Sequence, residues 1–219
     1  MTKSVIFDLD GTLIDSKIQI SKNFNLVLSE FGYEQLHNEV FHKNIGLPPE
    51  NFLHNLSMPD FVKQQIILKF RETMFADTKG IVVYPFVIQI LELLQRNNYL
   101  LGIATTKPTK LAKSVVENSE LKGYFHCIQG TDDFMPKPNP AVILRCQAQL
   151  RTIISIMVGD RVEDIRAAVA ANIPSVGVAQ GFHSKEKLKR SGASLVVINM
   201  KDLFDQLQEG DLYSRLKLK

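Results

Sequence analysis

After residue 80, short apolar runs alternate with segments whose apolar residues recur at helical spacing. The apolar runs, including one near the start of the chain, cover residues 4–9, 100–105, 125–129, 153–159, 175–178 and 195–198. Helical patterns cover about residues 85–96, 109–118, 139–149 and 162–171, with a short one near 185. Strands that alternate with helices form a parallel sheet with right-handed crossovers and helices on both faces. We therefore predict an α/β fold with a doubly wound parallel sheet.

The first helix of this series offers a sequence signal for its start. Proline is favoured at the first position of a helix, where its missing N–H leaves no hydrogen bond unmade. We therefore expect Pro85 to open that helix, and Asn97 and Asn98 to end it.

Residues 16–79 carry helical patterns and no convincing strand. One apolar stripe at helical spacing ends before Gly32 and comprises Ile20, Phe24, Val27, Leu28 and Phe31. A second, within about residues 60–75, comprises Val62, Ile66, Phe70 and Met74. We predict an all-helical domain over 16–79, inserted into an α/β core formed by 1–15 and 80–219.

Composition excludes several classes of protein. Of the 219 residues, 45% are hydrophobic and 22% charged, which is ordinary for a globular protein. The net charge of +3 is too small to indicate nucleic-acid binding. The 2 cysteines lack CxxC spacing, and neither a signal peptide nor an apolar run of membrane-spanning length is found. We expect a cytoplasmic protein that binds neither nucleic acid nor membrane.

Polar residues follow the apolar runs at the places where a parallel sheet binds its ligand, the carboxyl ends of the strands. Gly11 allows the backbone to bend just after the first of these ends. The polar residues concerned are Asp8 and Asp10 after the first run, Thr105, Lys137 between two prolines, and Asp160 with Asp164. We expect their side chains to converge on one site.

This set of residue types points to phosphoryl chemistry. Clustered carboxylates repel one another unless a cation is present, and oxygen ligands with room for water suit Mg²⁺. A cation beside a lysine and a hydroxyl can bind a phosphoryl group. One carboxylate can then attack phosphorus to form an aspartyl-phosphate, while a second serves as general acid and base. The residues by themselves suggest a phosphatase.

The motifs that carry these residues resemble those of the haloacid dehalogenase superfamily, in its phosphatase form. The matching segments are 8–16 (Asp-Leu-Asp-Gly-Thr-Leu-Ile-Asp-Ser), Thr105, 137–140 (Lys-Pro-Asn-Pro) and 159–165 (Gly-Asp-Arg-Val-Glu-Asp-Ile). The resemblance extends over essentially the whole chain. The helical insert resembles the cap domain of the subgroup that includes phosphoglycolate phosphatase.

The resemblance implies a role for each matched residue. Asp8 would be the nucleophile and a Mg²⁺ ligand, and Asp10 the general acid/base, with its backbone carbonyl on the metal. Thr105 and Lys137 would hold the phosphoryl oxygens. The remaining implied roles are metal binding by Asp160, metal binding directly or through water by Asp164, and phosphate contact through the backbone at Thr106.

Three residues depart from the subgroup's usual pattern. Arg161 stands where a small hydroxyl residue is frequent, and Thr106 stands where asparagine is common. Lys43 lies in a cap loop that often begins with arginine and reaches the substrate. A lysine is a point charge without a planar fork, so we expect Lys43 to bind substrate with altered leaving-group recognition.

We therefore expect a Mg²⁺-dependent hydrolase of small phosphate monoesters, monomeric or homodimeric, with phosphoglycolate as the favoured compound and the cap choosing the leaving group. One alternative is a sugar phosphomutase, although such enzymes usually carry Glu-Asp-Ser where this chain has Gly159-Asp160-Arg161. Another is a phosphate-binding regulatory module without turnover. A dehalogenase is disfavoured, because Asp10 and the Mg²⁺-type carboxylates suit phosphate.

Overall fold

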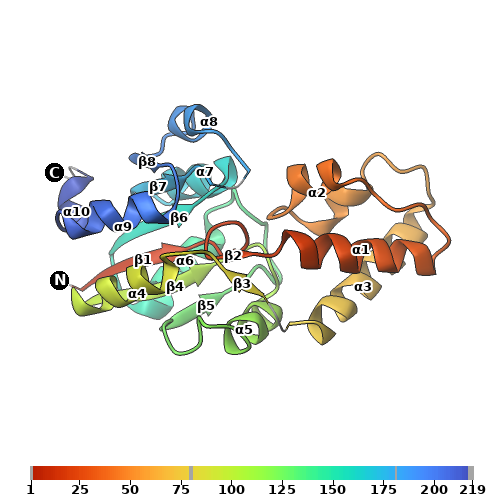
Figure 1. The fold of residues 1–219 in the computed structure, drawn as a ribbon, viewed down its shortest axis with the longest axis horizontal. Coiled ribbons are helices and arrows are strands. Elements are labelled where there is room, and N and C mark those ends of the chain that lie inside the picture. Colours follow the sequence, from red (N-terminus) through yellow and green to blue (C-terminus); the bar gives the residue numbers. More distant parts are fainter. Residues whose placement is uncertain (1, 79–80, 181, 217–219) are drawn as a thin grey trace.

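A six-stranded, entirely parallel sheet forms the centre of the computed structural model, which describes residues 2–78, 81–180 and 182–216 (Figure 1). The strand order is β5-β4-β1-β6-β7-β8. The strands are β1 (Lys3–Phe7), β4 (Tyr99–Ala104), β5 (Cys127–Gln129), β6 (Ile154–Gly159), β7 (Ser175–Val178) and β8 (Leu195–Val197). The predicted doubly wound α/β fold is confirmed.

Strand β1 lies in the middle of the sheet, where Val5 pairs with Leu101 of β4 and with Ile156 of β6. Successive side chains of a strand point to opposite faces, and both faces of β1 are apolar. Val5 and Phe7 belong to one buried cluster and Ile6 to another. Burial on both faces explains why β1 has a continuous apolar sequence.

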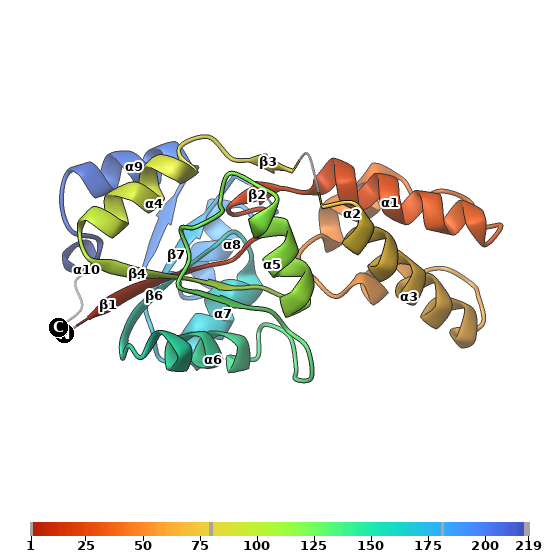
Figure 2. The same cartoon turned by 90° about the horizontal axis from the view of Figure 1, so that it is seen from below.

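Helices cover both faces of the sheet (Figure 2). One buried cluster includes side chains of α4 (Val87–Arg96), α5 (Thr109–Glu117) and α9 (Met200–Gln208). The other includes side chains of α6 (Ala141–Leu150) and α7 (Val162–Ala170). The short helices α8 (Lys185–Arg190) and α10 (Leu212–Arg215) complete this part of the fold.

The helices of the predicted insert form a separate group beside the sheet, which we call the helical unit (Figures 1 and 2). It comprises α1 (Lys17–Glu30), α2 (Asn38–Asn44), the 3-10 helix η1 (Pro49–Leu53) and α3 (Asp60–Ala76). Phe24 of α1 is fully buried at its centre. Its ring centroid lies 6.0 Å from that of Phe41, 4.8 Å from Phe52 and 4.9 Å from Phe70. The apolar stripes read from the sequence therefore form the core of the helical unit.

The chain enters and leaves the helical unit through two short strands. These are β2 (Ile14–Asp15) and β3 (Val82–Val83), which pair antiparallel. Asp15 accepts a hydrogen bond from the backbone N–H of Lys17, 3.1 Å away, at the start of α1. The two connections therefore lie side by side, close to the loop that follows β1.

The start of α4 differs from expectation. The helix begins at Val87, and its N-cap is Phe86, whose φ of 67° lies in the left-handed region. Pro85 therefore lies outside the helix, and its predicted place at the first helical position is wrong. The helix does end at Arg96, before the two asparagines, as predicted.

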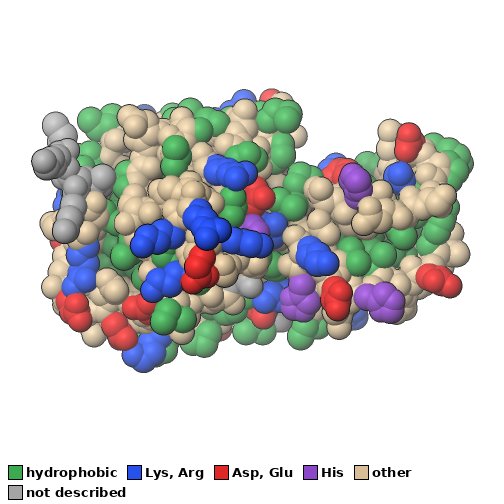
Figure 3. Space-filling view, turned by 90° about the horizontal axis from the view of Figure 1, so that it is seen from above, with side chains coloured by type: hydrophobic (Ala, Val, Ile, Leu, Met, Phe, Trp, Pro, Cys, Tyr) green, Lys and Arg blue, Asp and Glu red, His purple; other side chains and the backbone are tan. Residues whose placement is uncertain are grey.

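Lysine and arginine side chains gather on the face seen from above (Figure 3). Helix α8 lies on this side of the molecule, and Lys185, Lys187, Lys189 and Arg190 are all exposed. These cations form a solvated helix face. Among the described helices, none is both long and apolar enough to cross a membrane.

Candidate active site

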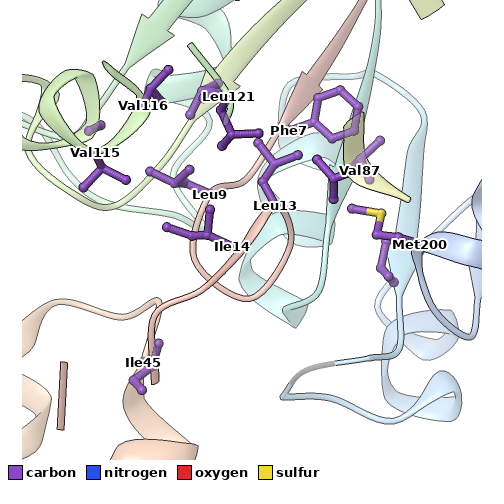
Figure 4. Close-up of a cluster of buried hydrophobic side chains, with 14 of the residues drawn as sticks. Phe7, Leu9, Leu13, Ile14, Ile45, Val87, Val115, Val116, Leu121 and Met200 are labelled. Atoms are coloured by element: carbon purple, nitrogen blue, oxygen red, sulfur yellow. The ribbon is translucent and has the colours of Figure 1, made fainter. Parts of the chain in front are cut away.

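Buried side chains anchor the loop that follows β1 (Figure 4). Leu9, Leu13 and Ile14 point into the cluster that also contains residues of α5 and the first residue of α9, and each is at most 1% exposed. Gly11 has a φ of 90°, and a Cβ atom there would lie 2.6 Å from Asp160 Oδ2. Only glycine allows this turn to pass so close to β6.

The anchored loop directs Asp8 toward Lys137. Lys137 Nζ donates to Asp8 Oδ1 at 2.7 Å, to Asp164 Oδ1 at 2.6 Å and to the carbonyl oxygen of Ala104 at 3.0 Å. Carboxylate oxygens of Asp8, Asp160 and Asp164 all lie within 4.8 Å of one another. The carboxyl ends of β1, β4 and β6 thus meet at one buried cluster of charges.

Burial and mutual repulsion shift the titration of this cluster. Burial raises the pKa of Asp8 to about 7, although the Lys137 ammonium lowers it. Burial also raises the pKa of Asp160 well above its usual value, and Asp164 and Asp8 raise it further. Burial alone would lower the pKa of Lys137, but Asp164 and Asp8 raise it above the ordinary value. The raised pKa values of Asp8 and Asp160 show that the single lysine does not balance three ionised carboxylates.

The donor set fits a hard divalent cation. Thr12 Oγ1 donates to Asp160 Oδ1 at 2.8 Å, whereas Asp160 Oδ2 is buried with no hydrogen-bond partner among the described residues. An unpaired buried carboxylate oxygen is costly unless a cation meets it. Asp164 differs, since its Oδ1 accepts from Lys137 and its Oδ2 accepts from the backbone N–H of Arg161 at 3.0 Å. Asp8 and Asp160 are thus the better direct ligands.

Asp10 lies in the same loop but outside this cluster. It is 5% exposed, and its Oδ2 forms an ion pair with Lys107 Nζ at 3.2 Å. Sequence reasoning missed Lys107. The available signal was a cation two residues beyond Thr105, at a strand end already assigned to the site. Asp10 Oδ1 is buried without a partner among the described residues, so it is available to a ligand.

The other predicted site residues, Thr105, Thr106 and Lys43, differ in where they lie. Thr105 is 1% exposed and directly follows β4, and Thr106 lines a pocket that also reaches Asp10. Lys43 is exposed at the end of α2 and lines a separate depression with His42, Phe182 and others. A substrate contact by Lys43 stays a prediction.

Arg161 joins the sheet to the helical unit. Its guanidinium donates to the carbonyl oxygens of Ile45 at 2.6 Å and Lys43 at 3.2 Å, both at the end of α2. It also pairs with Glu163 at 3.2 Å, and the side chain is almost completely buried. A Cβ atom on Gly46 would lie 2.8 Å from Arg161 Cδ. The residue that the sequence marked only as unusual is therefore a bridge between the two parts of the molecule.

A pocket of about 360 Å³ lies between the helical unit and the carboxyl ends of the strands. From the sheet side it is lined by Asp10, Thr106 and Lys107. From the other side it is lined by residues of α1, η1 and α3 and of the segment that follows α2. The pocket gives a bound molecule access to Asp10 while the helical unit covers it.

The sequence pattern of the haloacid dehalogenase-like hydrolases matches residues 5–178. The chain belongs to this family. It is similar to a probable phosphatase, IndB, of Dickeya dadantii, with 32% identity over 100% of this chain and 96% of the other. It is 25% identical to a phosphoglycolate phosphatase of Salmonella typhimurium, over 94% of this chain and 92% of that protein.

Solved structures agree with this assignment to the haloacid dehalogenase-like hydrolases. A predicted phosphatase from Clostridium acetobutylicum superposes with a TM-score of 0.84 at 30% identity, covering 95% of this chain and 99% of the other. A putative phosphatase from Clostridium difficile superposes with a TM-score of 0.81 at 32% identity, covering 94% of this chain and 98% of the other. The coverage shows that the helical unit and the sheet both belong to the shared fold.

Proposed function

We propose that this protein is a Mg²⁺-dependent phosphatase that hydrolyses small phosphate monoesters through an aspartyl-phosphate on Asp8. The observation that carries the proposal is the buried cluster of Asp8, Asp160 and Asp164 around Lys137. Membership of a hydrolase family and likeness to proteins named as phosphatases support the same reaction. We also propose that the protein acts in the cytoplasm and that residues 16–79 serve as a cap.

In the proposed reaction, a carboxylate oxygen of Asp8 attacks phosphorus while Asp10 donates a proton to the leaving oxygen. The alcohol departs, and Asp10 then takes a proton from the water that cleaves the aspartyl-phosphate. Inorganic phosphate is released, and Asp8 and Asp10 return to their initial states. The contact of Asp10 Oδ2 with Lys107 holds the carboxyl group in one position near the pocket, and Oδ1, which has no partner among the described residues, is the oxygen that would carry the proton.

Lys137 and Thr105 would hold phosphoryl oxygens at the strand ends. Lys137 would also favour the ionised form of Asp8 and hold its side chain in place, which its hydrogen bond to Asp8 supports. Asp8 and Asp160 would hold Mg²⁺, with the backbone carbonyl of Asp10, and Asp164 would act on the metal through water. When bound, the cation would neutralise the carboxylates and the charge that develops on the phosphoryl group. The helical unit would exclude bulk water while the ester is bound.

Phosphate release from a panel of monoesters, with Mg²⁺ and with EDTA, tests this function. We expect release that depends on Mg²⁺ and is lost in both Asp8→Asn and Asp10→Asn, with the fold retained by circular dichroism. Release that persists in EDTA, or in Asp8→Asn, would contradict the mechanism. Conversion of β-glucose 1-phosphate without phosphate release would instead identify a phosphomutase.

A further inference from the structure

The pocket above Asp10 receives the alcohol part of the ester, because Asp10 is the group proposed to protonate the leaving oxygen. The chemistry of its lining therefore selects the substrate. This inference rests on the proposed phosphatase function, and it concerns which monoesters the site accepts.

Apolar side chains form much of the pocket wall. Ile45, Phe52, Phe70 and Met74 line it from the helical unit, and Leu111 of α5 lines it from the sheet side. Each of them is at most 6% exposed, so these positions are fixed by packing and change little when a ligand enters. A volume of about 360 Å³ lies within the range of pockets that enclose whole small molecules.

The charges that line the pocket do not favour a second anion. The cations are Arg71 and Lys107, and the carboxylates are Asp10, Glu50 and Asp132. Arg71 pairs with Glu50 at 3.0 Å where both side chains are exposed, and Lys107 pairs with Asp10 at 3.2 Å where both are buried. Every cation of the described lining is thus already paired with a carboxylate that lines the same pocket. An anionic leaving group would have to displace one of these carboxylates or lie beside it.

We propose that the preferred substrates are phosphate monoesters of uncharged alcohols that carry an apolar face, and that phosphoglycolate, whose glycolate leaving group carries a carboxylate, is a poor substrate. An uncharged leaving group meets no repulsion from Glu50 or Asp132. Its apolar face is removed from water against the rings of Phe52 and Phe70, which favours binding. Like charges placed side by side at a binding site oppose it.

Two matched pairs of substrates separate charge from apolar contact. The first pair is phosphoglycolate and its carboxamide, which have nearly the same shape and differ by one charge. We expect kcat/KM to be about tenfold higher or more for the carboxamide. The second pair is 2-phenylethyl phosphate and ethyl phosphate, for which we expect about tenfold or more in favour of the phenyl compound.

A single substitution tests whether the pairing of Arg71 with Glu50 causes the discrimination against phosphoglycolate. Glu50→Gln leaves Arg71 without its carboxylate, so kcat/KM for phosphoglycolate should rise several-fold while that for the carboxamide changes less than about twofold. Glu92→Gln is the matched control, because it removes a carboxylate from the exposed pair with Arg96 on α4, and should leave both values unchanged.

The outcomes are distinguishable. A wild-type preference for phosphoglycolate over its carboxamide, or equal values for the two, overturns this inference and leaves the phosphatase function standing. Equal values for the phenyl and ethyl esters remove the apolar part of the proposal. No phosphate release from any ester in the presence of Mg²⁺ rejects the phosphatase function, and this inference with it.

Discussion

Replacing Arg161 by methionine tests how the helical unit is held against the sheet. The substitution keeps an apolar stem next to Gly46 but removes the donors to the carbonyl oxygens of Ile45 and Lys43, 2.6 and 3.2 Å away. A hydrogen bond from a charged group contributes about 1.5–3 kcal/mol. Arg161 is 3% exposed, so water screens these bonds little. Taking the lower figure for each bond, docking of the helical unit should weaken by about 3 kcal/mol, roughly a hundredfold in the docking equilibrium.

Hydrogen exchange read by mass spectrometry measures this effect. In Arg161→Met, amides of residues 41–47 should exchange faster by about two orders of magnitude, in line with the weaker docking equilibrium. Arg161→Lys retains the charge and one possible hydrogen bond, so its exchange rates should lie between those of the wild type and Arg161→Met. Arg96→Met removes an exposed arginine from α4 and is the matched control. Unchanged exchange over residues 41–47 in Arg161→Met would refute the reasoning, whatever happens to activity.

Three further predictions concern the charge cluster. Asp8→Asn should reduce phosphate release to background without lowering the melting temperature, and a variant with near-normal turnover would rule out Asp8 as nucleophile. Lys137→Met leaves Asp8 and Asp164 buried without their partner, so the metal-free protein should lose about 3–5 kcal/mol of unfolding free energy in urea, and Mg²⁺ should restore part of it. An equal loss with and without Mg²⁺ would argue against a cation site beside Lys137. The pKa of Asp8 is raised to about 7 in the folded state, so the stability due to its protonated form is complete below pH 4 and is lost as the pH rises through 7. In metal-free protein the contribution of Asp8 to the free energy of unfolding should therefore fall by on the order of 4 kcal/mol between pH 4 and pH 8, and the raised pKa of Asp160 acts in the same direction. Thermal melts with saturating Mg²⁺ should show a much smaller loss. Equal slopes in the two series would contradict this assignment.

The sequence predicts the elements that have strong periodicity. The stripe of α1, from Ile20 to Leu28, and the apolar strands β1 and β6 were predicted because burial dictates their composition. The two-residue strands β2 and β3 were missed, since a pattern of period two needs more than two residues to be seen. Helix α9 was also missed, although Met200, Leu203 and Leu207 lie at helical spacing and the helix is as long as α5 and α7, which were predicted.

The site residues also divide into those that the sequence predicts and those that it does not. Asp8, Lys137 and Asp160 were predicted to converge because each follows a strand of one parallel sheet. The topology of such a sheet brings the strand ends together, so this prediction needs no knowledge of side-chain packing. The bonds of Arg161 to the helical unit could not be predicted. They depend on how two separately packed parts dock, and backbone carbonyl acceptors leave no trace in the sequence.

The position of β1 has a consequence for how this protein is made. Lys3 pairs with Tyr99 on one side and Ile154 on the other, so the middle strand is synthesised before either neighbour. At about 5–20 residues per second, roughly 8–30 s separate the emergence of β1 from that of β6. Throughout that interval Val5, Ile6 and Phe7, which are fully buried in the finished fold, have no completed sheet to cover them. The strand that positions Asp8 therefore stays without its β6 neighbour throughout that interval.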